Sequence, residues 1–168
     1  MKLTKLYLVP MAFATLTVVS SGAALADSKY DTFTVKASVV AKCTIDTTAA
    51  SIDFGSYDAF STTDYAVSST VSIACTKGAP DLTLALSGGA KPTTIGGATM
   101  NQMSGASDLL AYGLYQDSDH TTPWHGTSRK IASATKNAVP YTIYGVVPKG
   151  QNVSVGDYSD TVTATINF

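Results

Sequence analysis

Apolar and polar residues alternate along several short stretches of this chain. The first stretch runs from Thr32 to Cys43, where every second position is apolar or Cys43 itself. An alternation of period 2 is typical of a β-strand with one buried side, so we expect a strand here. The same pattern returns at residues 67–75, 82–86, 112–115, 141–144 and 162–168. Short strands at such spacing predict an all-β sandwich.

Turn-forming clusters separate the predicted strands. They are Lys77–Asp81, Ser87–Gly89, Ile95–Gly97, Pro148–Gly150 and Gly156–Asp157, all rich in glycine, proline or aspartate. These clusters leave no room for a long helix. No repeat, charge block or linker divides the chain after residue 26, which indicates a single domain.

The first 26 residues have the three regions of a secretory signal peptide. A lysine-containing start is followed by an apolar stretch over residues 6–19 and by small residues that end at Ala26. We expect residues 1–26 to be removed on export. The apolar stretch is shorter than the roughly 20 residues of a spanning helix, and no later segment approaches that length. We therefore expect an exported protein without a membrane span.

The charge balance argues against nucleic acid and anionic membranes as partners. After removal of residues 1–26, nine basic residues stand against twelve acidic ones, and every acid is aspartate. Proteins that bind nucleic acid need basic surfaces for the phosphates. The abundance of Thr, Ser, Val, Tyr and Gly again favours strands and turns.

The two cysteines, Cys43 and Cys75, both lie in the exported part of the chain. An oxidising compartment would join them, so we predict one disulfide, with a pair of buried free thiols as the alternative. Closing a loop of this length stabilises a fold by roughly 3–4 kcal/mol on the chain-entropy model.

We expect the last predicted strand, residues 162–168, to have an uncovered edge. The chain stops at Phe168 inside the alternating run, so we expect the free edge of this strand to lack a later segment that covers it. Exposed apolar edge strands aggregate unless something pairs with them. The alternating apolar segment near the N-terminus could be accepted by a neighbour through strand addition.

Other kinds of site have weaker support. His120 and His125 lie near Asp117 and Asp119, but two histidines in a polar loop do not make a zinc pattern, and calcium-loop spacing is absent. No motif of a nucleophile elbow or a phosphate-binding loop occurs, and a turn explains Asp157 and Asp160. We expect no enzyme activity, metal or cofactor. A sugar-binding face is the remaining alternative, built from the aromatics Tyr57, Phe60, Tyr112, Tyr115, Trp124, Tyr141 and Tyr144.

A series of landmarks, taken in order, resembles the spore coat protein U domain, the domain of archaic (Csu-type) chaperone-usher pilins. The landmarks are Cys43-Thr44-Ile45, Asp53-Phe54-Gly55-Ser56-Tyr57, Cys75-Thr76-Lys77-Gly78, Tyr112-Gly113-Leu114-Tyr115, Trp124, Tyr144–Gln151, Gly156–Val162 and Phe168.

The resemblance implies an incomplete immunoglobulin-like sandwich that lacks its last strand and is completed by a donated strand. A periplasmic chaperone, and later the N-terminal extension of a neighbouring pilin subunit, would supply that strand during assembly at an outer-membrane usher. We expect a donor-strand extension over residues 27–42 and a pilin domain over 43–168. The donor residues would be Phe33, Val35, Ala37 and Val39, and the acceptor edge would hold Val162, Ala164, Ile166 and Phe168.

The function that follows from the resemblance is that of a structural subunit of a cell-surface pilus serving adhesion and biofilm formation. Two alternatives remain open at this point. One is a secreted monomeric β-sandwich module that binds a carbohydrate or a surface. The other is a coat protein of spores or cysts.

Overall fold

The computed structural model describes residues 27–89, 91–105, 107–132 and 134–168. The predicted signal peptide, residues 1–26, lies outside the described residues. Residues 38–168 form one compact unit, and residues 27–37 belong to a separate unit. The described residues contain strands, turns and loops but no helix, which confirms the predicted all-β class.

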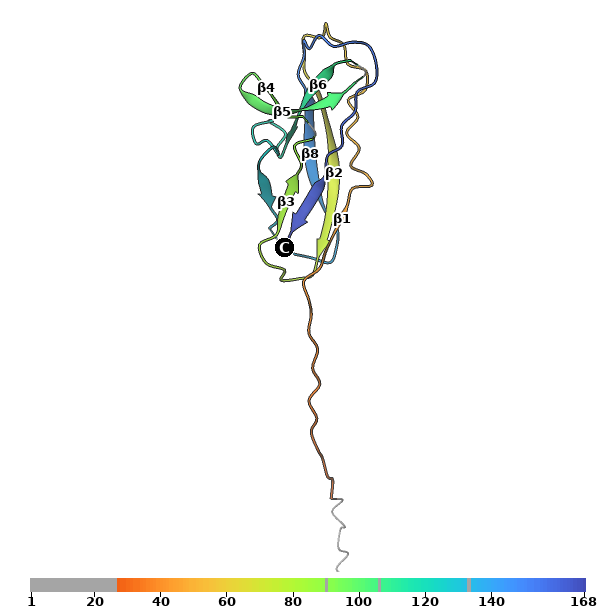
Figure 1. Ribbon diagram of the computed structural model, residues 1–168. Coiled ribbons are helices and arrows are strands. Elements are labelled where there is room, and N and C mark those ends of the chain that lie inside the picture. Colours follow the sequence, from red (N-terminus) through yellow and green to blue (C-terminus); the bar gives the residue numbers. More distant parts are fainter. Residues whose placement is uncertain (1–26, 90, 106, 133) are drawn as a thin grey trace, which may run out of the picture. The chain divides into compact units, whose positions relative to one another are not determined.

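One sheet has six antiparallel strands, and its spatial order differs from the chain order (Figure 1). The longest strands, β2 and β8, pair from Tyr65 opposite Val147 to Ile73 opposite Val139. In spatial order the strands are β1 (Cys43–Asp46), β2 (Tyr65–Cys75), β8 (Val139–Val147), β6 (Leu109–Tyr115), β5 (Ala98–Ser104) and β4 (Thr93–Ile95).

The second sheet has three antiparallel strands: β7 (Ser128–Lys130), β3 (Thr83–Leu86) and β9 (Ala164–Asn167). The central strand β3 pairs with β7 on one side and with β9 on the other. In Figure 1, β9 is the dark blue arrow that ends beside the C-terminal mark. The strand β9 is therefore an edge strand of its sheet.

The core lies between the two sheets. Val71 and Ile73 of the larger sheet and Leu84 and Leu86 of the smaller one belong to the same buried cluster. Trp124, which lies in the loop before β7, is 1% exposed and joins this cluster. Each fully buried aliphatic side chain of this kind stabilises the fold by about 1.5–3 kcal/mol. Alternation in β2 and β3 thus packs one face of each sheet against the other.

The hairpin that joins β4 to β5 has a two-residue turn made of glycine. Gly96 and Gly97 have φ angles of 60° and 85°. A type I′ turn needs positive φ at both central residues, which glycine adopts at no steric cost. The glycine cluster in the sequence therefore marks a hairpin whose two strands were not predicted.

The predicted strand over residues 32–43 is wrong for the chain taken by itself. Only Cys43 of this range lies in a strand, and residues 27–42 have exposed side chains without helix or strand. The alternation correctly describes one apolar face on an extended segment. A strand also needs a hydrogen-bonding partner, and none of the described residues pairs with residues 32–41 in a sheet.

Candidate functional site

An apolar groove of about 680 Å³ runs along the side of the sandwich. One wall is the segment that begins in β1 and continues through residues 45–54, and the other is the segment 158–164 that leads into β9. The floor comes from both sheets and consists of Val71, Leu86, Met103, Tyr112, Leu114 and Ile143. The groove therefore opens directly onto core residues.

Two edge strands, β1 and β9, meet at one end of the groove. Among the described residues, β1 pairs with β2 alone and β9 pairs with β3 alone. Each strand thus keeps one edge whose backbone groups lack a partner in a sheet. Some Cα atoms of β1 and β9 approach within 8 Å. Adjacent strands lie about 4.8 Å apart, so a strand inserted there would have to part them.

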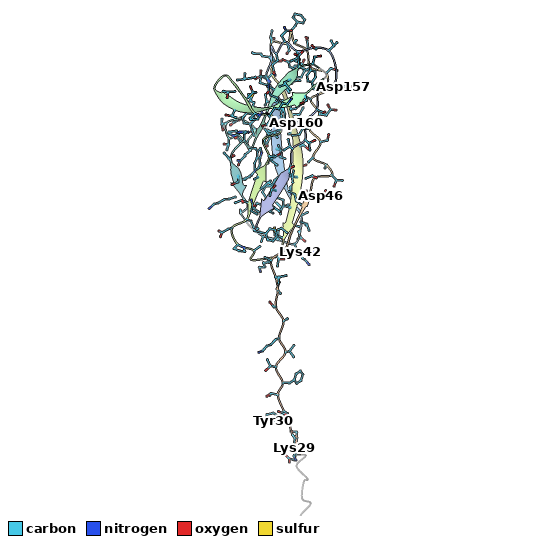
Figure 2. The ribbon with its side chains drawn as sticks, in the orientation of Figure 1. Lys29, Tyr30, Lys42, Asp46, Asp157 and Asp160 are labelled. Carbon is cyan, nitrogen blue, oxygen red and sulfur yellow. A yellow bond between two sulfur atoms is a disulfide. The ribbon has the colours of Figure 1, made fainter. Side chains whose placement is uncertain are left out.

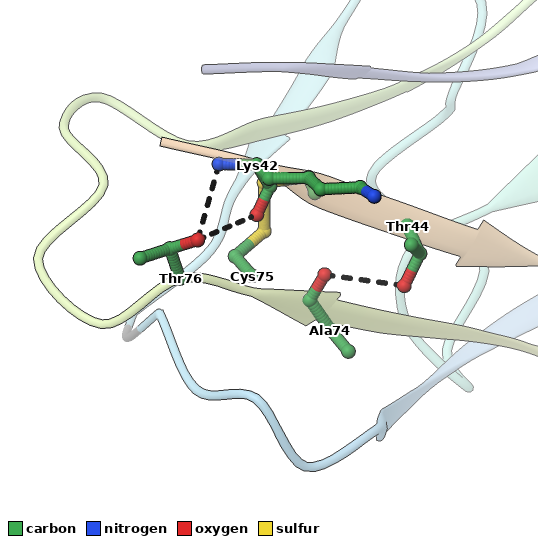
Figure 3. The surroundings of a disulfide bond; sticks show 6 residues. Lys42, Thr44, Ala74, Cys75 and Thr76 are labelled. Carbon is green, nitrogen blue, oxygen red and sulfur yellow. Dashed lines mark hydrogen bonds between the residues drawn. A yellow bond between two sulfur atoms is a disulfide. The ribbon is translucent and has the colours of Figure 1, made fainter. Parts of the chain in front are cut away.

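The disulfide fixes the first wall. Cys43 and Cys75 are joined as the sequence predicts, and they are direct partners in the β1–β2 pairing. Around the bond, Thr76 N donates to Lys42 O at 2.8 Å, and Thr76 Oγ1 bonds the backbone of Lys42 (Figure 3). β1 has only four residues and therefore few backbone pairs with β2. The disulfide and the bonds between Thr76 and Lys42 help to hold it in place.

The rest of the first wall packs on a glycine of β8. A Cβ atom at Gly145 would lie 2.9 Å from Phe54 Cζ and 3.0 Å from Ile52 Cγ2. Only glycine lets the segment carrying these two side chains approach the sheet so closely. Sequence reasoning missed this wall, because the alternation in Ile52-Asp53-Phe54 indicates an apolar face but not the residue against which that face packs.

The second wall is fastened to the floor at its polar end. Tyr112 Oη donates a hydrogen bond of 2.7 Å to Asp160 Oδ2, while Thr161 N donates to Asp160 Oδ1. Burial, together with the bond to Asp160, raises the pKa of the Tyr112 phenol. The wall is also tied to β5, because Ser104 and Ser159 exchange backbone hydrogen bonds.

The predicted acceptor residues divide into three positions. Val162 and Ala164 line the groove. Ile166 packs against the core from β9 but lies outside the groove lining. Phe168 lies beyond β9, is 53% exposed and belongs to neither set.

The predicted donor residues are exposed. Phe33, Val35 and Val39 have exposed fractions of 87%, 81% and 82%, and Ala37 is exposed as well. Leaving such side chains in water forfeits about 1.5–3 kcal/mol each compared with burial. The chain therefore has an open apolar groove, and it also has an alternating segment whose apolar side chains are all exposed.

In the loop that follows β6, the carboxylate of Asp117 forms hydrogen bonds within the loop. Asp117 accepts hydrogen bonds from the backbone N–H groups of Thr121 and Thr122, which lowers its pKa to about 2. The His120 ring stands edge-on to the rings of Tyr115 and Tyr144. Across the part of the chain that the structure describes, no three His, Cys, Asp or Glu residues are grouped to hold a metal ion. Nor does any helix in that part have the length and apolar character to cross a membrane.

The model of the Spore Coat Protein U domain family matches residues 29–165. The chain belongs to this family. The match confirms the resemblance seen in the sequence, and it includes the exposed segment and both walls of the groove.

One curated relative and one solved structure show how far the similarity of this spore coat protein U domain reaches. Protein U of Myxococcus xanthus is 43% identical over 65 residues, which are 38% of this chain and 36% of Protein U. A chain in the crystal structure of the CsuC–CsuE chaperone–tip adhesion subunit pre-assembly complex, from archaic chaperone-usher Csu pili of Acinetobacter baumannii, has a similar fold. Its TM-score is 0.55 at 22% identity, over 77% of this chain and 40% of that one.

Proposed function

We propose that this protein is a structural subunit of a cell-surface pilus, assembled by donor-strand exchange. The observation that carries the proposal is the pairing of two features in one chain. The groove between the segments 45–54 and 158–164 opens onto the core, and the segment around Phe33, Val35 and Val39 exposes an apolar face at every second residue. Each subunit would insert this segment into the groove of a neighbour.

Strand insertion would cover the apolar side chains of the groove and give its backbone groups hydrogen-bonding partners. Burying Phe33, Val35 and Val39 contributes roughly 5–9 kcal/mol before the cost of ordering the segment. The free edges of β1 and β9 would gain hydrogen bonds to the inserted strand, as in other cases of strand addition. Such a contact dissociates slowly, which suits a fibre.

The partners follow from this scheme. A subunit with an open groove would aggregate in the periplasm, so a chaperone would cover the groove until an outer-membrane usher exchanges it for the next subunit. The similar fold found in a chaperone–subunit pre-assembly complex supports this role of a chaperone. The fibre would lie outside the cell and serve adhesion and biofilm formation. Catalysis has no part in this function.

A coat protein of resting cells is the second candidate. The description of the family, Spore Coat Protein U domain, favours it. Electron microscopy of cells that express this subunit with a chaperone and an usher separates the two: fibres support the pilus, whereas an even layer supports the coat.

The test of strand exchange compares two substitutions on opposite faces of the same segment. Residues 27–168 are prepared with Val35→Asp or with Thr34→Asp, which place one carboxylate inside or outside the groove. The account predicts oligomer ladders that resist mild detergent for the unchanged chain and for Thr34→Asp. Val35→Asp should abolish them, and equal ladders for both variants would refute the proposal.

A further inference from the structure

The compact unit carries opposite charges at its two ends. The lysine end comprises Lys42, the loop 76–82 and the described residues from the end of β7 to β8, 130–132 and 134–138, where four exposed lysines accompany one acid, Asp81. The aspartate end comprises the loops 55–64 and 148–160 with residues 105, 107 and 108, where five aspartates accompany Lys149. The lysines are Lys42, Lys77, Lys130 and Lys136, and the aspartates are Asp58, Asp64, Asp108, Asp157 and Asp160.

The length of β2 separates these ends. Tyr65 follows the loop 55–64 directly and Cys75 precedes the loop 76–82, so eleven strand residues lie between them. At about 3.3 Å per residue, these eleven residues separate the ends by roughly 36 Å. Figure 2 shows Lys42 at one end and Asp157 and Asp160 toward the other.

A phenylalanine stands on the aspartate end in full contact with solvent. Phe60 is 93% exposed. Its loop is held by hydrogen bonds to the turn after β8: Tyr57 Oη donates to Pro148 O at 3.0 Å, and Lys149 donates to Asp64 Oδ1 and to Thr62 O. The ring is thus presented by an ordered loop, which lowers the entropy cost of docking.

The lysine end holds a hollow of about 320 Å³. Its apolar lining includes Leu82 and Ile131, which are 5% and 9% exposed and are joined by a backbone hydrogen bond of 2.9 Å. Ala79, Ala132 and Ala134 complete that apolar lining, beside Asp81, Thr83 and Lys130. An apolar cavity of about 150 Å³ is large enough for benzene, so the volume of this hollow leaves room for a phenyl ring.

We propose that Phe60 of one copy enters this hollow on the next copy, with the aspartate end of the first facing the lysine end of the second. The inference rests on the proposed fibre, in which the segment before Lys42 lies in a neighbour's groove. A contact between two different surfaces of the same molecule repeats head to tail, which builds an open chain of subunits wherever its rotation does not close a ring. The opposite charges orient the encounter, and the aromatic anchor stabilises it.

The proposed contact requires a donated strand that runs antiparallel to β9. Lys42 comes shortly after the donor segment, so only this direction brings the lysine end of one copy to the aspartate end of the next.

Engineered cysteines test the contact in the full chain of residues 27–168. Both native cysteines are in the disulfide, so a new pair reports on new contacts. One variant combines Ala59→Cys with Ala132→Cys, which keeps the Phe60 ring in place. The matched control combines Val155→Cys with Ala132→Cys, because Val155 is fully exposed on the same end.

After oxidation and boiling without reductant, the Ala59–Ala132 cysteine pair should form covalent ladders at a rate roughly tenfold above the control pair, and high salt should slow this reaction. The same samples, not oxidised and not boiled, report on strand exchange. Equal cross-linking rates for the two cysteine pairs would overturn the docking contact. So would the absence of a covalent ladder in a protein that still forms the detergent-resistant ladder before boiling. Loss of the unboiled ladder overturns strand exchange instead, and a covalent ladder that persists without it supports docking alone.

Discussion

Tyr112 and Asp160 join the floor of the groove to its second wall through a hydrogen bond of 2.7 Å. Tyr112 lies on β6 in the larger sheet, and Asp160 lies on the segment that leads into β9 of the smaller one. A single side-chain bond thus connects the two layers at the polar end of the groove.

Replacing Tyr112 with Phe should destabilise the protein by about 1–2 kcal/mol, because the bond to a carboxylate is lost while the ring is kept. Chemical denaturation measures the difference. An unchanged free energy of unfolding would show that the bond does not fasten the wall.

Alkaline pH should reveal the same bond. The pKa of Tyr112 is raised above its usual value of 10.0 by burial and by Asp160. The unfolded chain therefore loses this proton at lower pH than the folded chain, so the contribution to stability is complete below pH 10 and declines above it. The free energy of unfolding should fall more steeply above pH 10 in the unchanged protein than in Tyr112→Phe. Parallel curves would contradict this assignment.

The disulfide should contribute strongly to stability and to the shape of the groove. Reduction, or the double substitution Cys43→Ala with Cys75→Ala, should cost roughly 2–4 kcal/mol and lower the melting temperature. Because the bond holds β1 on β2, donor binding should weaken too. Melting with and without reductant measures the effect, and the double variant serves as a control that reductant leaves unchanged. A groove that binds the donor equally well after reduction would show that β1 does not need this link.

Gly145→Ala should destabilise the protein by about 1–3 kcal/mol, because its new Cβ would press on Phe54 and Ile52. In a strand without this contact, alanine would be the more favourable residue. Adding Phe54→Ala should recover part of the loss attributable to Gly145→Ala, a coupling that a double-mutant cycle measures. Additive effects would mean that the wall does not rest on this glycine.

Sequence patterns predict the strands that have one clean buried face. β2 and β9 alternate, so the period of their apolar residues is enough to identify them. In β5 the neighbours Met100 and Asn101 are both buried, at 8% and 3% exposed, and this breaks the alternation. β7 is polar throughout, with the sequence Ser-Arg-Lys, and no apolar period marks it.

The candidate site was predictable only in part. The alternation of Val162 and Ala164 indicates an inward face, and both line the groove. The opposite wall depends on contacts such as Ile52 with Gly145, which are distant in sequence and leave no local signal. Alternation also cannot tell whether the partner of a strand lies in the same chain, which is why residues 32–42 were predicted as a strand within the fold.

The most direct measurement adds a synthetic peptide of residues 30–40 to a chain that lacks residues 27–40. If the groove accepts this segment, the peptide should raise the melting temperature by about 10 °C or more, because binding to the folded state alone stabilises it by mass action. A peptide with Val35→Asp should have little effect. If the truncated chain is already stable and the peptide leaves its melting temperature unchanged, the protein is a complete domain and the strand-exchange account is wrong.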